Sequence, residues 1–240
     1  VIGMATIVPF AFFAAKRMIP AGYSWRLLAP TAHVGFQGAI GWWMVASGLE
    51  YRTDVSHFRL ATHLLTALFL LAGLMWTARD LQILAKNPAA KTAKLTGIGW
   101  AVFAIVLLQL LLGAWVAGLN AGYVANSWPL MNDHVYPKGV DWTGGALTTF
   151  TNDPFLLHFL HRWWAFVAAG AILWLSFKLS QEGDTGLSHA LRLIIVVQVV
   201  LGILPVTSNM AMWIAVAHRF VGAILVAILA VALHQQGRRY

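Results

Sequence analysis

The sequence predicts an all-α, polytopic transmembrane helical bundle, and its composition and one recurring pattern carry that prediction. Apolar residues make up 60% of the 240 residues and charged residues only 10%, and the mean hydropathy is +0.72. These values are too apolar for a water-soluble domain of this length. Charge-free apolar runs of about 20 residues, which is the length that crosses a bilayer core as a helix, recur along the whole chain.

We therefore expect about seven membrane spans with no long soluble domain between them. Their ranges are 1–15, 27–48, 59–78, 95–118, 156–177, 190–207 and 211–233. The first range has only about 15 apolar residues before Lys16, which suits a helix cut midway or a short, tilted helix. Pro205, Ser208 and Asn209 interrupt the last apolar stretch and predict a short turn at the membrane surface.

The basic residues lie on alternate connections between these ranges. A net charge of +8 is also typical of proteins that bind nucleic acid. No nucleic-acid partner is expected here, because basic membrane proteins carry Lys and Arg in cytoplasmic loops. One side holds Lys16, Arg17, Arg26, Arg79, Lys86, Lys91, Lys94, Lys178, Arg192, Arg238 and Arg239. The other holds Glu50, Asp54, Asp133, Asp141 and Asp153 against Arg52 and Lys138. We expect a multi-pass protein of the bacterial inner membrane, or of the mitochondrial inner membrane, with its C-terminus on the cytoplasmic or matrix side.

Two stretches of the chain share a spaced set of residues. The set Gln37, Gly41, Val45 and Ser47 recurs at identical spacing as Gln198, Gly202, Val206 and Ser208. Each set is followed, after a short outer turn, by a helix with an early histidine, His63 in one case and His218 in the other. The pattern indicates an internal duplication. Gln37 and Gln198 are expected to bond across helices, with no role in chemistry assigned to them.

Three histidines lie inside apolar ranges near their outer ends: His63, His161 and His218. Ligand-capable side chains within a span are costly and so indicate function. A pair from two facing helices suits both axial positions of a heme iron, while the alternative for His161 and His218 is an interhelical hydrogen bond. Arg162 and Arg219 follow two of these histidines; they either bind heme propionates by charge-assisted bonds or extend to the lipid headgroups.

The remaining histidines and the lack of cysteine limit the chemistry further. His158 lies three residues before His161, on roughly the same helix face, so spacing does not decide which of the two binds a metal. Solvated or interfacial roles are expected for His33, His57, His134, His189 and His234. The chain has no cysteine, which excludes thiolate ligands and iron–sulfur clusters, so any redox centre must be held by other side chains.

Five stretches along nearly the whole chain carry a family resemblance. They are GFQGAIGWWMVASGL at 35–49, DVSHFRLATHLL at 54–65, LLLGAWVAGLNAGYVANSWPLMND at 110–133, FLHRWWAF at 159–166 and VAHRF at 216–220. They resemble the heme A synthases, which convert heme O to heme A for terminal cytochrome oxidases. The resemblance implies eight helices in two pseudo-symmetric four-helix halves, matched here from the middle of the second helix onward. The cysteine-free loop at 119–155 resembles the proteobacterial and mitochondrial branch.

The resemblance also implies roles for the two halves. Residues 1–86 would form an incomplete N-terminal half-bundle for the substrate heme, and residues 87–240 a C-terminal four-helix half-bundle for heme b. His161 and His218 match the ligands of the heme b iron. His63 matches a ligand of the substrate heme, heme O, whose C8 methyl group is oxidised to the formyl group of heme A.

The family's catalytic glutamate and first histidine, in a Glu-x-x-His-Arg motif, are expected upstream of Val1. The chain as given should therefore hold heme b more securely than it performs the reaction, and activity is attributed to the parent protein. The implied partners are heme O, the lipid bilayer, heme O synthase and assembly factors of cytochrome c oxidase.

Two other functions fit parts of the sequence. A membrane cytochrome b would use His161 and His218 to relay electrons without substrate chemistry, but it leaves the duplicated half with His63 unexplained. A transporter built from repeats would need broken helices and charges at the midplane of the membrane, and the predicted spans lack such charges. Acid–base and hydrolytic enzymes are disfavoured, since no carboxylate lies within a predicted span.

Overall fold

The computed structural model describes residues 2–48 and 54–239, and every regular element named in them is a helix. The long helices are α1 (Ile2–Ala15), α2 (Ser24–Val45), α3 (His57–Lys86), α4 (Gly97–Gly118), α6 (Pro154–Gln181), α7 (Thr185–Thr207) and α8 (Met212–Gly237). The connection between α4 and α6 holds the 3-10 turn η1 (Ala121–Tyr123) and the short helix α5 (Ala146–Asn152). Each of the seven long helices overlaps one of the seven predicted ranges, and several extend beyond it. Glu50 and Arg52, which were assigned to an outer loop, lie outside the described residues.

Five of these helices are long and apolar enough to cross a membrane: α3, α4, α6, α7 and α8. Helix α1 is apolar but has only 14 residues. Helix α2 has 22 residues and includes Arg26, His33 and Gln37; it is not among the five. The sequence-based prediction of a polytopic helical membrane protein is confirmed.

Helix α3 is longer than its predicted span, and this changes the expectation that the spans contain no carboxylate. It continues past residue 78 to Lys86 and so includes Asp80, a carboxylate within one of the five spanning helices. The Asp80 side chain is only 1% exposed, and Arg26 Nη1 donates to its Oδ2 at 2.7 Å. The buried charge is thus paired, as a carboxylate in such a place must be, and the pair ties α2 to α3.

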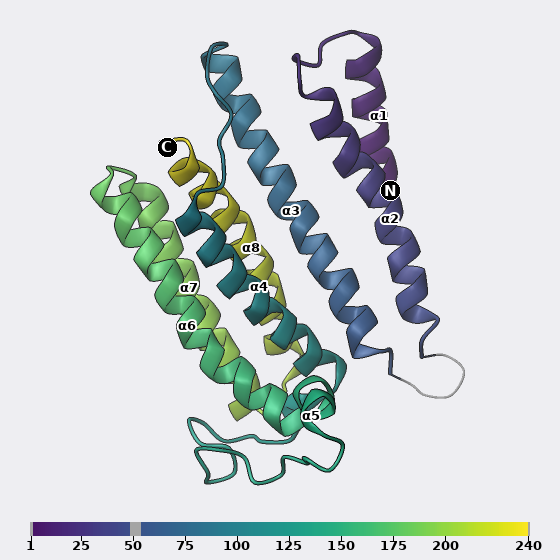
Figure 1. Ribbon diagram of the computed structural model, residues 1–240, viewed down its shortest axis with the longest axis vertical. Coiled ribbons are helices and arrows are strands. Elements are labelled where there is room, and N and C mark those ends of the chain that lie inside the picture. Colours follow the sequence, from purple (N-terminus) through teal and green to yellow (C-terminus); the bar gives the residue numbers. More distant parts are fainter. Residues whose placement is uncertain (1, 49–53, 240) are drawn as a thin grey trace. The chain divides into compact units, whose positions relative to one another are not determined.

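The chain divides into two compact units, Val1–Thr92 and Ala93–Tyr240. In the first unit, α2 packs against both α1 and α3. In the second, α4 packs on α6, α6 on α7 and α7 on α8, and contacts of α8 with α4 and α6 close a four-helix bundle (Figure 1). Leucines fill the core of this bundle, and Leu157, Leu175, Leu179 and Leu191 have no exposed surface.

Local signals start and stop the helices of the bundle. Asp153 caps α6 by accepting a hydrogen bond from the Leu156 N–H at 2.7 Å, and Pro154 occupies the first turn, where its missing N–H costs nothing. The predicted turn between α7 and α8 is present, with Asn209 and Met210 at φ of 51° and 61°. Pro205 lies inside the last turn of α7 instead of in the turn itself.

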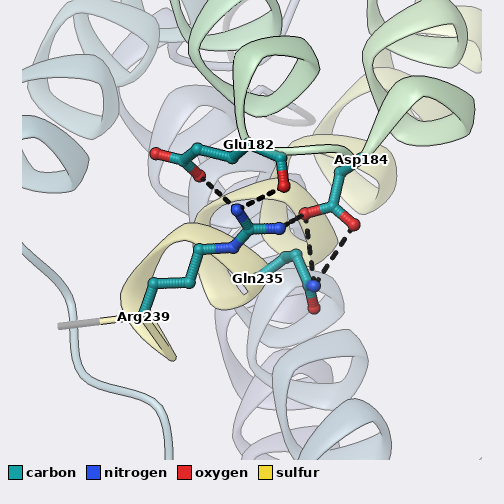
Figure 2. A network of polar contacts seen from close by, with 4 residues as sticks. All are labelled: Glu182, Asp184, Gln235 and Arg239. Carbon is teal, nitrogen blue, oxygen red and sulfur yellow. Dashed lines mark hydrogen bonds and ion pairs between the residues drawn. The ribbon is translucent and has the colours of Figure 1, made fainter.

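One end of the bundle is tied by a polar network (Figure 2). Gln235 Nε2 donates to both carboxylate oxygens of Asp184 at 3.3 Å. The Arg239 guanidinium pairs with Asp184 and, at 3.1 Å, with Glu182 Oε2, and it also donates to the Glu182 carbonyl at 2.7 Å. The network fastens the α6–α7 turn to the C-terminal end of α8.

The other end of the bundle carries the long connection between α4 and α6 (Figure 1). It is folded on itself: Asp153 Oδ2 accepts from the Asp141 N–H at 3.0 Å, and Thr149 Oγ1 donates to the Asp141 carbonyl at 2.9 Å. The Thr143 N–H donates to Asp141 Oδ1 at 2.9 Å and holds the pKa of that carboxyl below its ordinary value. This ordered loop covers the end at which the candidate histidines of the bundle lie.

Candidate functional site

The three candidate histidines occupy the same kind of local setting. Each packs against a neighbouring helix that presents a glutamine and, four residues later, a glycine. The three sets are Gln37, Gly41 and His63; Gln109, Gly113 and His161; and Gln198, Gly202 and His218. The first set lies in the first unit, on α2 and α3, and the other two lie in the four-helix bundle.

Each glycine makes room for an imidazole ring. A Cβ atom at Gly113 would lie 2.8 Å from Cε1 of His161, which is closer than real Cβ contacts come. The corresponding distances are 3.3 Å from Gly202 to His218 and 3.2 Å from Gly41 to His63. Any larger residue would crowd the ring, so these glycines leave the space that the three imidazole rings occupy.

Each glutamine hydrogen-bonds near the same histidine. Gln109 Nε2 lies 3.1 Å from Nδ1 of His161 and donates to the His161 carbonyl at 3.2 Å. Gln198 Nε2 lies 3.3 Å from Nδ1 and 3.5 Å from Nε2 of His218. In the first unit, Gln37 Nε2 donates to the His63 carbonyl at 3.3 Å and to Thr66 Oγ1 at 3.1 Å. The expectation of cross-helix bonds from Gln37 and Gln198 is confirmed.

The third copy of this arrangement was missed by sequence reasoning. Gln109 and Gly113 repeat the Gln-x-x-x-Gly spacing in QLLLG at 109–113. The following positions lack the valine and serine that marked the other two copies, and the helix that carries His161 begins after a connection of more than thirty residues. A search for the spacing alone would have found it.

His161 and His218 come together within one bundle. They lie on α6 and α8, which contact each other. Each is about two turns from the N-terminal end of its helix, so both lie toward the end that carries the long loop. The arrangement places two imidazoles on helices that contact each other, and their binding of an iron stays a prediction.

An apolar pocket lies on the α2–α3 pair of the first unit, and His63 is not among its lining residues. The pocket has a volume of about 380 Å³ and is lined by Phe36, Ala39, Ile40, Trp43, Thr62 and Thr66. Thr62 and Thr66 lie one residue before and three after His63 on α3.

His158 and Arg162 are both committed to contacts within the protein. Arg162 is 6% exposed, and its Nε donates to His158 Nε2 at 3.0 Å. The guanidinium also donates to three loop carbonyls, of Ala125 at 3.0 Å, Ser127 at 2.9 Å and Leu130 at 3.4 Å. His158 is therefore placed to support Arg162, and Arg162 to hold the loop onto α6.

Arg219 differs from Arg162, although both directly follow a candidate histidine. Its side chain is exposed on α8, and within the described residues no ion pair or side-chain hydrogen bond engages it. Its guanidinium is thus open to an anionic group.

Two of the histidines expected in solvated or interfacial places are buried in the structure: His57, the first residue of α3, is 8% exposed and His234 is 0% exposed.

The donor set as a whole points to imidazole ligation. The described residues contain no group of three or more His, Cys, Asp or Glu side chains that could hold a metal ion. A divalent cation bound without a porphyrin needs such a cluster of protein ligands. Two facing imidazoles instead suit an iron whose other four positions are filled by a porphyrin.

Comparisons with known proteins agree on one family. A family model described as cytochrome oxidase assembly protein matches residues 1–230. The heme A synthase of Sphingopyxis alaskensis is 64% identical over 239 residues, covering 100% of this chain and 67% of the relative. That of Erythrobacter litoralis is 53% identical, covering 99% and 70%, and that of Novosphingobium aromaticivorans is 47% identical, covering 99% and 69%.

The match extends over both units, although this chain spans only about two thirds of the length of these relatives. No solved structure matches the chain. Since the family model covers the helices that carry all three Gln–Gly–His sets, and relatives of high identity align along nearly the entire sequence, the chain belongs to the cytochrome oxidase assembly protein family.

Proposed function

We propose that this protein acts as a heme A synthase, a heme-dependent oxidoreductase that converts heme O to heme A for cytochrome c oxidase biogenesis. The relatives that match 99% or more of the chain at 47% to 64% identity carry that name. The structural observation that supports it best is the pair His161 and His218 on the contacting helices α6 and α8, each with a glycine that leaves room for its ring and a glutamine beside it.

The residues present fit a heme b between α6 and α8. His161 and His218 supply two neutral nitrogen ligands, and Gly113 and Gly202 leave their rings room. Arg219, exposed and uncommitted within the described residues, is placed to bind a propionate, a charge-assisted contact that stabilises an anion at the membrane surface. Arg162 keeps the loop in place, and a propionate contact from it stays a prediction. When bound, heme b supplies a one-electron redox centre.

The first unit is proposed to receive the substrate heme. His63 packs against Gly41, and the same pair of helices carries an apolar wall made by Phe36, Ile40 and Trp43. An apolar wall excludes water and orients a hydrophobic substrate. The reaction oxidises the C8 methyl group of heme O through successive hydroxylations to a formyl group, and the electrons released must pass to an acceptor.

We further propose residues 1–86 as the substrate-heme half and residues 87–240 as the heme b half. The protein would lie in the bacterial inner membrane with its C-terminus in the cytoplasm, because Lys178, Arg192, Arg238 and Arg239 gather at the inner end. Heme O synthase and oxidase assembly factors are its proposed partners, since one supplies the substrate and the others use the product.

The test is the heme content of the detergent-purified chain, measured by pyridine hemochrome spectra and by chromatography of the extracted hemes. We expect heme b in the wild type, and its loss in His161→Ala and in His218→Ala. Heme O or heme A should be recovered in an amount that depends on His63. His189→Ala is the control, because His189 is exposed on α7 away from the three sets, and it should change nothing.

The outcomes separate the proposal from its closest rival. A membrane cytochrome b would retain heme b at both sites and take up no heme O when the substrate is supplied. Protein that is free of heme in every preparation would contradict both functions.

A further inference from the structure

Arg59 lies near the N-terminal end of α3, and among the described residues of the first unit it is the one Lys or Arg at that end. The others lie toward the opposite end of α2 and α3: Lys16, Arg17, Arg26, Arg79, Lys86 and Lys91. Membrane proteins gather Lys and Arg on one side of the bilayer. An arginine at the other end therefore points to a specific role.

The Arg59 guanidinium is held by Trp43 of the neighbouring helix α2. Its Nη1 donates to the Trp43 carbonyl at 2.8 Å, and its Cζ lies 4.6 Å from the centre of the Trp43 ring. Stacking on an aromatic face and a hydrogen bond together orient a guanidinium. A guanidinium has five N–H donors, and among the described residues no other group accepts a hydrogen bond from Arg59. Most of its donors are therefore available to an anionic ligand.

Arg59 also lies next to the two features of the first unit that are proposed to receive the substrate. Residues three, four and seven apart share one face of a helix. Arg59 is thus in line with Thr62 and Thr66, which line the apolar pocket, and one turn from His63. Trp43 lines the same pocket, so the pocket and the guanidinium share this ring. A cation, an apolar pocket and a candidate iron ligand are therefore neighbours on the α2–α3 pair.

We propose that Arg59 binds a carboxylate of the porphyrin substrate, and that the adjoining pocket takes an apolar part of the same molecule. The inference rests on the proposed function. Arg162 and Arg219 directly follow the other two candidate histidines, whereas Leu64 follows His63. Arg59, one turn away on α3, supplies the guanidinium that this position lacks. Arginine pairs with a carboxylate through two parallel hydrogen bonds, which fix the direction of the ligand as well as adding affinity.

The experiment compares ferric heme O, which carries two carboxylates, with its dimethyl ester, which carries none. Both are titrated into the detergent-purified His161→Ala chain, because that substitution is expected to empty the heme b site. Adding Arg59→Leu should lower the affinity for the diacid about tenfold or more, as expected for loss of hydrogen bonds to a charged group. The affinity for the diester should not change. Arg59→Lys should keep part of the affinity for the diacid, because it retains the charge but not the planar fork of donors.

Arg79→Leu in the same background is the matched control. Arg79 is a half-buried arginine of α3, as Arg59 is, but it lies near the other end of that helix; its loss should leave both affinities unchanged. If Arg59→Leu does not fold, Arg59→Gln decides, because its amide can keep the hydrogen bond to the Trp43 carbonyl.

The contrary outcomes separate this inference from the proposed function. Binding of heme O that depends on His63 but is unaffected by Arg59→Leu overturns the role of the arginine and leaves the substrate site standing. An equal loss of affinity for diacid and diester also overturns it, since the arginine would then support only the structure. Loss of a copurified anionic phospholipid, with both porphyrin affinities unchanged, would assign Arg59 to a lipid headgroup instead. Absence of any heme O binding that depends on His63 overturns the inference together with the substrate half of the proposed function.

Discussion

Gly113 and Gly202 each face the Cε1 edge of a histidine ring, and their lack of a Cβ atom gives the ring its place. Gly113→Ala would put a methyl group 2.8 Å from Cε1 of His161, so we expect the ring to be displaced. Alanine favours a helix over glycine by about 1 kcal/mol, and the helix itself should not weaken. Heme affinity should fall by about tenfold, as for loss of a neighbouring support, measured by titration with ferric heme b.

Gly170→Ala provides the comparison, because a Cβ atom at Gly170 would meet nothing within 4 Å. It should raise or leave unchanged the melting temperature and have no effect on heme. Gly202→Ala should be intermediate, since its Cβ would lie 3.3 Å from the His218 ring. Equal heme affinity in the Gly113 and Gly170 variants would contradict the inference that Gly113 makes room for the His161 ring.

At the level of elements, Arg162 joins α6 to the long loop by bonds to the carbonyls of Ala125, Ser127 and Leu130. Arg162→Leu leaves these acceptors and His158 without their donor. Hydrogen bonds from a charged group are worth about 1.5–3 kcal/mol each, but the bonds of one side chain are not additive, so we expect a loss of at least about 3 kcal/mol in stability and faster proteolysis within 124–135. Arg162→Lys should rescue only in part, because one ammonium cannot match the guanidinium's spread of donors.

Arg219→Leu is the counterpart on α8 and should give the opposite pattern. Its side chain is exposed, so the loop should stay protected against protease and stability should change by less than about 0.5 kcal/mol. Heme affinity should fall if the guanidinium binds a propionate. A loop loosened equally by both substitutions would contradict the anchoring role of Arg162.

The helices themselves could be predicted from the sequence. A helix that crosses the bilayer core needs an apolar run of about 20 residues, and backbone polar groups left unpaired in lipid are costly, so such runs are continuous. The ends were less certain. Helix α3 continues to Lys86 and α6 to Gln181, since charged residues beyond the apolar run can extend a helix past the bilayer core. The length of the apolar run marks where lipid begins, whereas the hydrogen bonds of the backbone mark where the helix ends.

The site was predicted as three histidines, and their surroundings were not. Composition gives no reason to pair Gln109 with His161, which is 52 positions along the chain, because only the packing of α4 on α6 brings them together. The capture of Arg162 by loop carbonyls depends likewise on how residues 125–130 fold, and a sequence pattern carries no information about that. The sequence shows which residue types could bind a ligand, but which residues they contact depends on how the bundle folds.

For the molecule as a whole, the distribution of charge predicts its orientation in the membrane. The chain has no cysteine, so single cysteines can be placed without any other change. Lys138→Cys lies in the long loop, Lys91→Cys in the connection before α4, and Gln181→Cys at the α6–α7 turn; all three side chains are exposed. Because Lys and Arg are retained on the cytoplasmic side, a membrane-impermeant maleimide should label Lys138→Cys in spheroplasts. The other two should react only after the membrane is disrupted, and the reverse pattern would place the C-terminus and the Arg239 network outside the cell.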